Sequence, residues 1–525
     1  MTTATARRRF PRMAAAAVSA LLLAAATACT PGDGTDPGAA EPGPAESATT
    51  ASADIIGDVP EELQEFYSQE VAWEECEGDF RCATVTVPMD YEDPGAGTLE
   101  LSTIMASADG EAEGTILINP GGPGGSGYDF VRQSLDQVAS DRLRENYNVL
   151  GFDPRGVGRS SPVKCLDDEE MDAARAEYVD PGTPEGLEEA RLSAKALADA
   201  CAAETGDLLG FVDTASAARD MDVLRAVVGD QKLNYLGFSY GTFLGATYAE
   251  LFPGNVGRLV LDGALDPSSS NEEVTLGQAA AFEKAIRAYV QDCLTGRNCP
   301  LEGTPDQAVQ TIQELLASVE ASPMTAADGR VVTVSTFVSG FILPLYDDAN
   351  WPVLSQALEG ALKDGDPTMM LRLADISADR DEDGHYKSNS TVAFSAVNCL
   401  DYPMVSDDAQ MAADARDLEA ASPTIGKYLA YGGITCEVWP HAPVNEPHPI
   451  KAAGAADLLV IGTTGDPATP YEWAQALAAQ MDSAVLVTWE GEGHTAYGRG
   501  SQCVEDVVDD YFVDGTVPEE DLVCS

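Results

Sequence analysis

The residues Gly237-Phe238-Ser239-Tyr240-Gly241 set the expected architecture of this chain. They follow the apolar run Leu233–Leu236 and precede Phe243–Ala249, which has the character of a helix. A serine on a sharp turn from a strand to a helix stands above the edge of a sheet, and flanking glycines leave room for the close backbone. The pattern therefore predicts that Ser239 is a nucleophile. A Gly-rich turn with a passive serine is the alternative.

A nucleophilic serine needs a general base, and the chain has only four histidines. His494 comes directly after the apolar run 484–489, so we expect it on a loop at the carboxyl end of a strand, where doubly wound sheets place their sites. Asp466 follows the preceding strand, 456–462, and is the expected carboxylate partner of the imidazole. Asp457 is a weaker choice because it lies before that strand. The remaining histidines are expected at the surface: His385, His441 and His448.

An oxyanion formed during attack by serine needs backbone N–H donors. We expect one from Tyr240, next to the nucleophile, and one from the Gly-rich segment Asn119–Gly127, which follows the apolar run 114–119. Gly122 is the preferred donor in that segment and Gly121 the second choice. A phosphate-binding loop is the alternative, but G-x-x-x-x-G-K-[ST] is absent and a G-x-G-x-x-G match means little in so glycine-rich a run.

Strands that alternate with helices indicate a mostly parallel sheet with helices on both faces. The expected strands are 83–87, 99–105, 114–119, 147–153, 232–237, 258–262, 456–462 and 484–489, and a helix is expected over 215–228. Between 267 and 449 the strand signal nearly disappears. Amphipathic helices are expected there over 271–293, 305–321, 350–362 and 407–421. We therefore predict an α/β core, 59–266 and 450–525, with an inserted helical lid, 267–449.

The first 28 residues have the pattern of an export signal. Four arginines between Arg7 and Arg12 precede the short apolar run 13–26. Cys29 follows Ala28 and is the expected site of a lipid anchor, whereas cleavage by an ordinary signal peptidase is the alternative. Residues 29–58 are rich in Pro, Gly, Ala and acidic residues, and so are expected to form a flexible linker. The predicted location is outside the cell, on the outer face of the membrane.

The cysteine count supports this export. The chain has 11 cysteines, and setting Cys29 aside leaves an even number that could pair in an oxidising compartment. Sequence does not fix the pairing. Chain order suggests that neighbours pair, which gives Cys76–Cys82, Cys165–Cys201, Cys293–Cys299, Cys399–Cys436 and Cys503–Cys524. Zinc binding is disfavoured because no C-x-x-C pair occurs.

The net charge of −57 excludes most nucleic-acid partners, which need a basic surface. It also argues against binding to anionic lipid through surface charge. A solubility function and an acidic field that attracts cationic substrates are both compatible with it. The segment 379–384 begins like a calcium loop, but its twelfth position is Ser390, and a solvated acidic turn is favoured. We predict no cofactor and no metal.

Taken together, these segments resemble the α/β-hydrolase peptidases related to proline iminopeptidase, and above all the secreted tripeptidyl aminopeptidases of actinomycetes. The similar stretches are Asn119–Gly127, Gly151–Ser160, Leu233–Thr242, Val256–Gly263, Cys399–Asp401 and the region from Asp466 to Cys524. The resemblance implies an α/β-hydrolase fold and the triad Ser239, Asp466 and His494.

The resemblance also implies an activity. It is that of a serine exopeptidase that releases short peptides, tripeptides in the first place, from free N-termini through an acyl-enzyme. The substrate ammonium then needs carboxylates of the lid, for which Asp401 and Glu437 are the candidates. An esterase of the same fold is one alternative, and a non-catalytic surface lipoprotein that binds peptides is another. The sequence predicts no oligomeric state.

Overall fold

The computed structural model describes residues 53–57, 59–499, 501–519 and 521–525. The expected export signal, Cys29 and most of the expected linker lie outside these described residues. Within the described part, no helix has the length and apolar character needed to cross a membrane.

Ten strands form one sheet in the order β1-β2-β3-β5-β4-β6-β7-β10-β11-β12. Their bounds are β1 Glu74–Cys76, β2 Phe80–Pro88, β3 Thr98–Ala106, β4 Thr115–Asn119, β5 Asn148–Phe152, β6 Leu233–Phe238, β7 Val256–Asp262, β10 Leu458–Gly465, β11 Ala484–Glu492 and β12 Leu522–Cys524. The pairs from β1 to β5 are antiparallel. Every pair from β5 to β12 is parallel. The eight strands expected from the sequence are all present, and the short edge strands β1 and β12 are additional.

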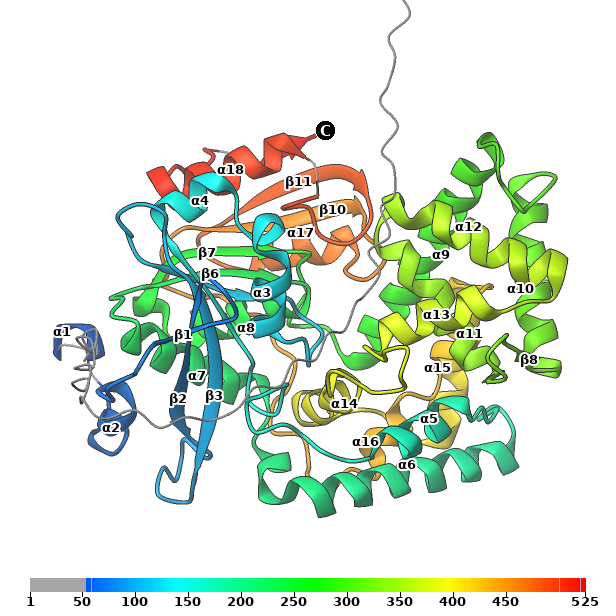
Figure 1. Cartoon of the computed structure of the whole chain (residues 1–525), viewed down its shortest axis with the longest axis horizontal. Coiled ribbons are helices and arrows are strands. Elements are labelled where there is room, and N and C mark those ends of the chain that lie inside the picture. The colour runs from blue at the N-terminus through cyan, green and yellow to red at the C-terminus, as the bar shows by residue number, and fades with distance from the viewer. Residues whose placement is uncertain (1–52, 58, 500, 520) are drawn as a thin grey trace, which may run out of the picture. The chain divides into compact units, whose positions relative to one another are not determined.

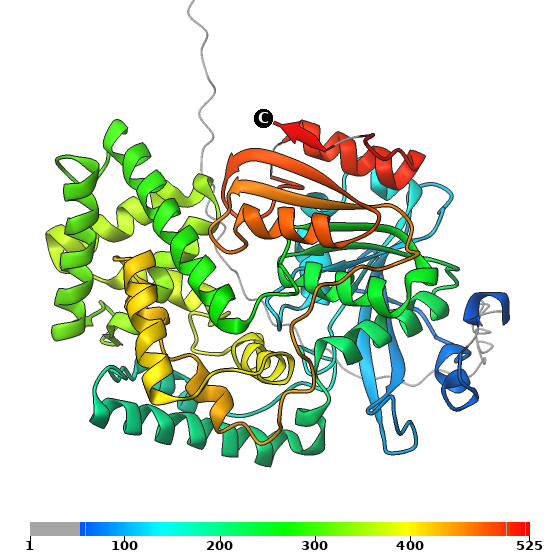
Figure 2. The same ribbon diagram turned by 180° about the vertical axis from the view of Figure 1, so that it is seen from behind.

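Helices cover both faces of this sheet, because side chains of the central strands are apolar on both sides. Leu117 of β4 packs in the same cluster as Leu244. Its neighbours Ile116 and Ile118 point to the opposite face and join Val504. Helices α7 and α8 lie behind the sheet in Figure 1 and in front of it in Figure 2, where α17 accompanies them. The helices of the core are α1 Ala53–Ile56, α2 Gln64–Tyr67, α3 Gly127–Val138, α4 Asp141–Asn146, α7 Thr214–Val227, α8 Tyr240–Leu251, α17 Tyr471–Gln480 and α18 Gln502–Asp514.

The chain between β7 and β10 forms a helical lid, shown on the right of Figure 1, with a hydrophobic core of its own. Its helices are α9 Asn271–Thr295, α10 Pro305–Ala321, α11 Val334–Ile342, α12 Trp351–Glu359, α13 Thr368–Ser377, α14 Ser390–Asp401, α15 Asp408–Ala421 and α16 Gly433–Glu437. Shorter elements are the turns η4 Leu343–Tyr346 and η5 Asp348–Asn350, the π-helical turn η6 Gly360–Asp364, and the hairpin of β8 Met324–Thr325 and β9 Val331–Val332. The predicted fold class, a mostly parallel sheet with helices on both faces and an inserted lid, is confirmed.

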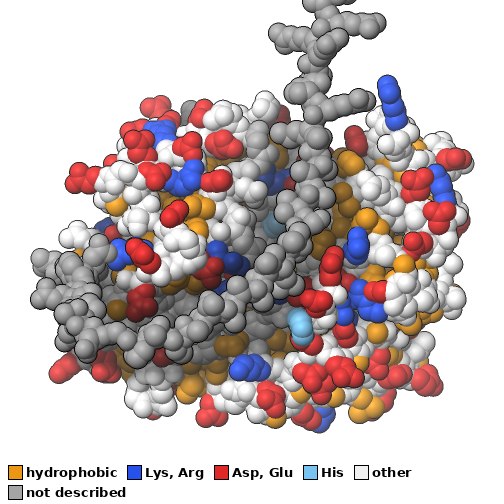
Figure 3. Space-filling view, in the orientation of Figure 1, with side chains coloured by type: hydrophobic (Ala, Val, Ile, Leu, Met, Phe, Trp, Pro, Cys, Tyr) orange, Lys and Arg blue, Asp and Glu red, His pale blue; other side chains and the backbone are white. Residues whose placement is uncertain are grey.

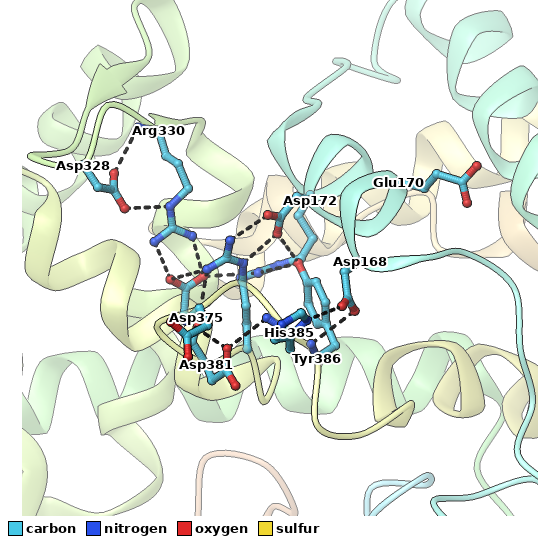
Figure 4. A network of polar contacts seen from close by, with 12 residues as sticks. Asp168, Glu170, Asp172, Asp328, Arg330, Asp375, Asp381, His385 and Tyr386 are labelled. Carbon is cyan, nitrogen blue, oxygen red and sulfur yellow. Dashed lines mark hydrogen bonds and ion pairs between the residues drawn. The ribbon is translucent and has the colours of Figure 1, made fainter. Parts of the chain in front are cut away.

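Two helices between β5 and β6 leave the sheet and lie against the lid (Figure 1). They are α5, Asp168–Ala176, and α6, Pro184–Thr205. Ion pairs bind α5 to the lid: Arg380 lies 2.7 Å from Asp172, and Arg175 lies 3.2 Å from Asp375. Asp172 and Asp375 are labelled in the network of polar contacts of Figure 4. Arg330 binds Asp375 from the other side at 2.7 Å. These two helices were not among those expected from the sequence, although each begins with an ordinary N-cap residue, Asp167 and Thr183.

Five disulfides join the cysteines that are neighbours in chain order, as the sequence suggested. The pairs are Cys76–Cys82, Cys165–Cys201, Cys293–Cys299, Cys399–Cys436 and Cys503–Cys524.

Acidic side chains are spread over the face that Figure 3 shows, on the core and on the lid alike. Lysines and arginines stand among them. On the described part of this face the charge is thus distributed over the surface. This distribution fits a solubility function better than an acidic field that attracts cationic substrates to one site.

The segment Gly151–Ser160, one of the stretches that carry the resemblance, contains Arg155, which forms a buried ion pair with Asp220. Both side chains of the pair Arg155 and Asp220 are fully buried, and they form two hydrogen bonds, of 2.8 and 2.6 Å. The Arg155 guanidinium also donates to the carbonyl oxygens of Met89 and Phe211, each at 2.9 Å. A single side chain therefore ties the end of β5 to α7 and to the chain after β2.

We expect Asp220→Ala to destabilise the fold by about 3–5 kcal/mol, because it leaves the Arg155 charge buried without a partner. Urea unfolding followed by circular dichroism measures this change. The control is Asp199→Ala, which removes the exposed Lys195–Asp199 pair on α6 and should change stability by less than about 1 kcal/mol. Equal midpoints for Asp220→Ala and the wild type would contradict the assignment.

Candidate active site

Ser239 occupies the strained turn between β6 and α8. Its backbone has φ 56° and ψ −124°, which is costly for a residue with a side chain. The glycines on either side are required by space. A Cβ on Gly237 would lie 2.4 Å from the carbonyl oxygen of Gly241, and one on Gly241 would lie 2.9 Å from that of Asn119. The turn leaves the Ser239 side chain partly exposed.

Asp466 and His494 form a close pair on the loops that follow β10 and β11. The imidazole Nδ1 lies 2.9 Å from both carboxylate oxygens of Asp466. Burial alone would raise the pKa of Asp466, but the pairing with His494 and the N–H groups of Thr469 and Thr495 hold that pKa below its usual value. The ionised carboxylate can only accept, so Nδ1 carries the proton and Nε2 is left as the acceptor.

The nucleophile turn and the histidine loop meet at the carboxyl end of β7. The N–H of Ser239 donates to the carbonyl oxygen of Asp262 at 2.9 Å, and the Asp262 carboxylate accepts from the N–H of Ala496 at 3.0 Å. A Cβ on Gly263 would lie only 3.4 Å from Cε1 of His494. Among the described residues, no hydrogen bond joins Ser239 Oγ to the imidazole in this structure. In enzymes without substrate this hydrogen bond is often long and tightens on binding.

The Gly-rich turn after β4 lies against the nucleophile. A Cβ on Gly121 would lie 2.8 Å from Ser239 Cβ and 3.0 Å from the amide nitrogen of Tyr240. The N–H of Gly121 already donates to Asn119 Oδ1 at 2.9 Å. By contrast, the N–H groups of Gly122 and Tyr240 donate to no residue in the described part of the chain. Of the two glycines considered, Gly122 is thus the one whose N–H has no acceptor among the described residues.

Asp401, expected to bind a substrate ammonium, lies at the end of α14 and is 2% exposed. Its Oδ1 accepts from the N–H of Thr214 at 2.9 Å and from Asn445 Nδ2 at 2.6 Å, and its Oδ2 accepts from Thr214 Oγ1 at 2.5 Å. Thr214 Oγ1 is in turn hydrogen-bonded to the hydroxyl of Tyr240. Asp401 therefore connects the lid to the residue after the nucleophile, and its carboxylate already accepts three hydrogen bonds from protein donors.

Glu437, the second candidate for the ammonium, lies at the end of α16. Its carboxylate accepts from Nε of Arg191 in α6 at 3.0 Å, and its side chain is 31% exposed. The described contacts do not bring Glu437 to the Asp466–His494 pair.

Two residues that no sequence pattern indicated contact the pair. Thr469 Oγ1 donates to Asp466 at 2.9 Å and lies 3.3 Å from His494 Nδ1. Tyr346 of the lid lies with its ring perpendicular to the imidazole, at 5.4 Å between centroids. Tyr346 is 148 residues before His494 in the chain, so only the fold brings them together.

The acidic segment 379–384 is held by protein contacts. Asp381 accepts from the N–H groups of Asp383 at 3.0 Å and of His385 at 2.9 Å, and Arg380 pairs with Asp172 (Figure 4). In the described residues, no group of three or more His, Cys, Asp or Glu side chains is placed to hold a metal ion.

Comparison with known proteins places these residues in a family context. A family model described as TAP-like protein matches residues 422–524, which include Asp466 and His494. The chain is similar to carboxylesterase B of Mycobacterium tuberculosis, with 38% identity over 85% of this chain and 86% of that protein. It is also similar to serine protease Hip1 of the same organism, with 35% identity over 87% and 91%. A tripeptidyl aminopeptidase of Streptomyces lividans is 31% identical over 87% and 86%.

We expect Gly121→Ala to lower the rate of acyl transfer by at least about 10²-fold. The new Cβ would lie 2.5 Å from the carbonyl oxygen of Phe238 and 2.8 Å from Ser239 Cβ, and residue 121 has φ 96°. Hydrolysis of a chromogenic ester measures the loss. Gly254→Ala is the control, since a Cβ there meets nothing within 4 Å. A wild-type rate in Gly121→Ala would show that the close contact between residue 121 and the turn of Ser239 is not needed for catalysis.

A second prediction concerns Asp401, whose pKa burial and the nearby Asp213 raise to about 7. The folded protein therefore holds a proton that the unfolded chain releases above about pH 4. This contribution to stability is complete below pH 4 and is lost as the pH rises to 7, by at most about 1.4 kcal/mol per pH unit. Asp401→Asn cannot ionise, and its amide can donate to Thr214 Oγ1.

Urea unfolding at pH 5 and pH 8 tests this expectation. Relative to the wild type, Asp401→Asn should be more stable at pH 8 than at pH 5. The control is Asp417→Asn, at an exposed residue of α15, which should follow the wild-type pH dependence. The same pH dependence in Asp401→Asn and the wild type would contradict the raised pKa.

Proposed function

This chain belongs to the family of tripeptidyl aminopeptidase-like serine hydrolases, and on that basis we propose that it is a serine exopeptidase that releases short peptides, tripeptides in the first place, from free N-termini. The observation that carries the proposal is the close pair of Asp466 and His494. Asp262 binds the N–H of Ala496 in the loop of His494 and also the N–H of Ser239. This arrangement supports a triad of Ser239, Asp466 and His494.

In the proposed mechanism Ser239 Oγ attacks the carbonyl carbon of the scissile bond while Nε2 of His494 takes the hydroxyl proton. Asp466 stabilises the imidazolium and fixes its orientation. The N–H groups of Gly122 and Tyr240 stabilise the oxyanion. The imidazolium then gives its proton to the leaving amine, which departs and leaves the acyl-enzyme. Water, deprotonated by His494, attacks the ester carbonyl carbon. The bond to Ser239 Oγ then breaks, the imidazolium returns its proton to that oxygen, and the peptide leaves with a carboxylate.

An esterase is the second candidate function, and the name of one relative favours it. The relative with 38% identity is named carboxylesterase B, whereas those with 35% and 31% are named as a protease and a tripeptidyl aminopeptidase. Esters and amides pass through the same acyl-enzyme, so the triad does not separate the two activities. The peptidase has the additional requirement of a site for the substrate ammonium. A purely non-catalytic peptide-binding lipoprotein is not retained, because the family is one of hydrolases.

We further propose that the enzyme acts outside the cytoplasm, anchored through lipid on Cys29. Five disulfides support this location, because such bonds persist mainly in oxidising compartments. The signal pattern and Cys29 in the sequence support export and the anchor, and analysis of the mature N-terminus by mass spectrometry tests both.

The test compares three substrates: a tripeptidyl amide with a free amine, its N-acetylated form, and a short ester. We expect kcat/KM for the free amine to exceed that for the blocked amide by at least about 10²-fold, because a site built for a charged group rejects the uncharged analogue. Ser239→Ala should abolish turnover and labelling by a fluorophosphonate. Ser318→Ala, at an exposed serine of α10, is the control. Turnover of the ester alone would favour the esterase, and full activity of Ser239→Ala would overturn the proposal.

A further inference from the structure

The segment of the lid that follows α11 contacts the histidine loop directly. The N–H of His494 donates to the carbonyl oxygen of Tyr346 at 2.8 Å. The rings of the two residues are almost perpendicular, with an interplanar angle of 86° and 5.4 Å between centroids. Both the backbone and the ring of His494 are thus in contact with one residue of the lid.

Arg499 connects the histidine loop to the lid through hydrogen bonds to the loop and an ion pair with a lid residue. Its guanidinium NH1 donates to the carbonyl oxygens of His494 at 3.2 Å and Thr495 at 3.1 Å. Its NH2 donates to Asp347 of the lid at 2.9 Å, and its guanidinium lies 5.4 Å from the ring centroid of Trp489. The Arg499 side chain is 16% exposed and that of Asp347 is 39% exposed, so the arginine of this pair is shielded from solvent and the aspartate is partly exposed.

The lid also holds the loop of Asp466, the partner of the base. From α9, Gln278 donates to the carbonyl oxygen of Ala468 at 2.9 Å, and Lys284 donates to that of Thr464 at 2.6 Å. The loops that contain Asp466 and His494 are therefore both bound by lid residues through their backbone. A displacement of the lid would act on the Asp466–His494 pair itself.

We propose that Tyr346 and Asp347 are positioning residues for His494, so that the lid sets the placement of the base as well as covering the site. This inference rests on the proposed function, since it assigns a partner to the proposed base. Tyr346 fixes the main chain and the ring edge, and Asp347 fixes the loop through Arg499. Misplacement of a reacting group by about 1 Å can lower a rate by up to about 10²-fold.

The test measures hydrolysis of a small ester, p-nitrophenyl acetate, which needs little contact with the lid for binding. Asp347→Ala and Arg499→Ala are each expected to lower kcat roughly tenfold with KM little changed. The double variant should lose little more than either single one. Arg499→Ala is essential, because Asp348 lies 3.7 Å from the guanidinium and could partly replace Asp347. The rate of labelling by a fluorophosphonate should fall in parallel.

Conservative variants separate positioning from mere loss of stability. Both Tyr346→Phe and Tyr346→Ala keep the main-chain carbonyl, but only Tyr346→Phe keeps the ring against the imidazole, so it should recover most of the rate that Tyr346→Ala loses. The control is Glu320→Ala, which breaks the Glu320–Lys427 pair within the lid, 2.6 Å long, and should leave kcat unchanged. Thermal unfolding of every variant identifies those that fail to fold, and the remaining members of the series then carry the test.

The outcomes distinguish this inference from the proposed function. If Ser239→Ala is inactive while Arg499→Ala and Tyr346→Ala keep the wild-type kcat and labelling rate, the positioning role is wrong and the hydrolase assignment stands. A rise in KM alone would likewise overturn the positioning role and assign these residues to substrate binding. If Ser239→Ala retains activity, the proposed function itself fails.

Discussion

The carboxyl end of β7 is the point on which the site depends. There the carbonyl oxygen of Asp262 accepts the N–H of Ser239, and its carboxylate accepts the N–H groups of Ala496 and Tyr497. Nucleophile and base come from segments more than 200 residues apart in the chain, and this one residue holds both. Burial raises the pKa of Asp262 to about 6, and its carboxylate is satisfied by backbone donors alone. The φ of 56° at Ser239 persists because its surroundings fix it from several sides.

The lid is attached to the core next to the residues of the candidate site. Helix α14 begins after Asn389, whose side chain forms hydrogen bonds with Gly156, Gly158 and Val163, and it ends at Asp401, bound to Thr214. It thus spans the region of the Gly-rich turn with both ends fixed. The other side of the lid holds the acid and base loops through backbone contacts. The lid thus contacts both loops of the candidate site, and the ion pair of Arg380 with Asp172 binds the lid to α5.

The names of the relatives differ: one is a carboxylesterase, one a serine protease and one a tripeptidyl aminopeptidase. A serine, a histidine and a carboxylate act on esters and amides alike, so these three residues do not by themselves select the substrate. In this chain both lid carboxylates expected to bind an ammonium are occupied by protein donors, Asp401 by Thr214 and Asn445, and Glu437 by Arg191. The geometry therefore supports the hydrolytic step more strongly than it supports any one substrate.

Sequence alone determined the strands, the fold class, and the pairing of Asp466 with His494, because these depend on local signals: apolar runs, glycines around Ser239, and side chains placed directly after strands. The pairing of cysteines also followed chain order. Tertiary structure alone decided that Gly121 lies against the turn of Ser239, that Asp401 faces Thr214, and that the lid meets His494 through Tyr346. Those facts depend on hydrogen bonds and packing between segments distant in the chain, and no local periodicity records them.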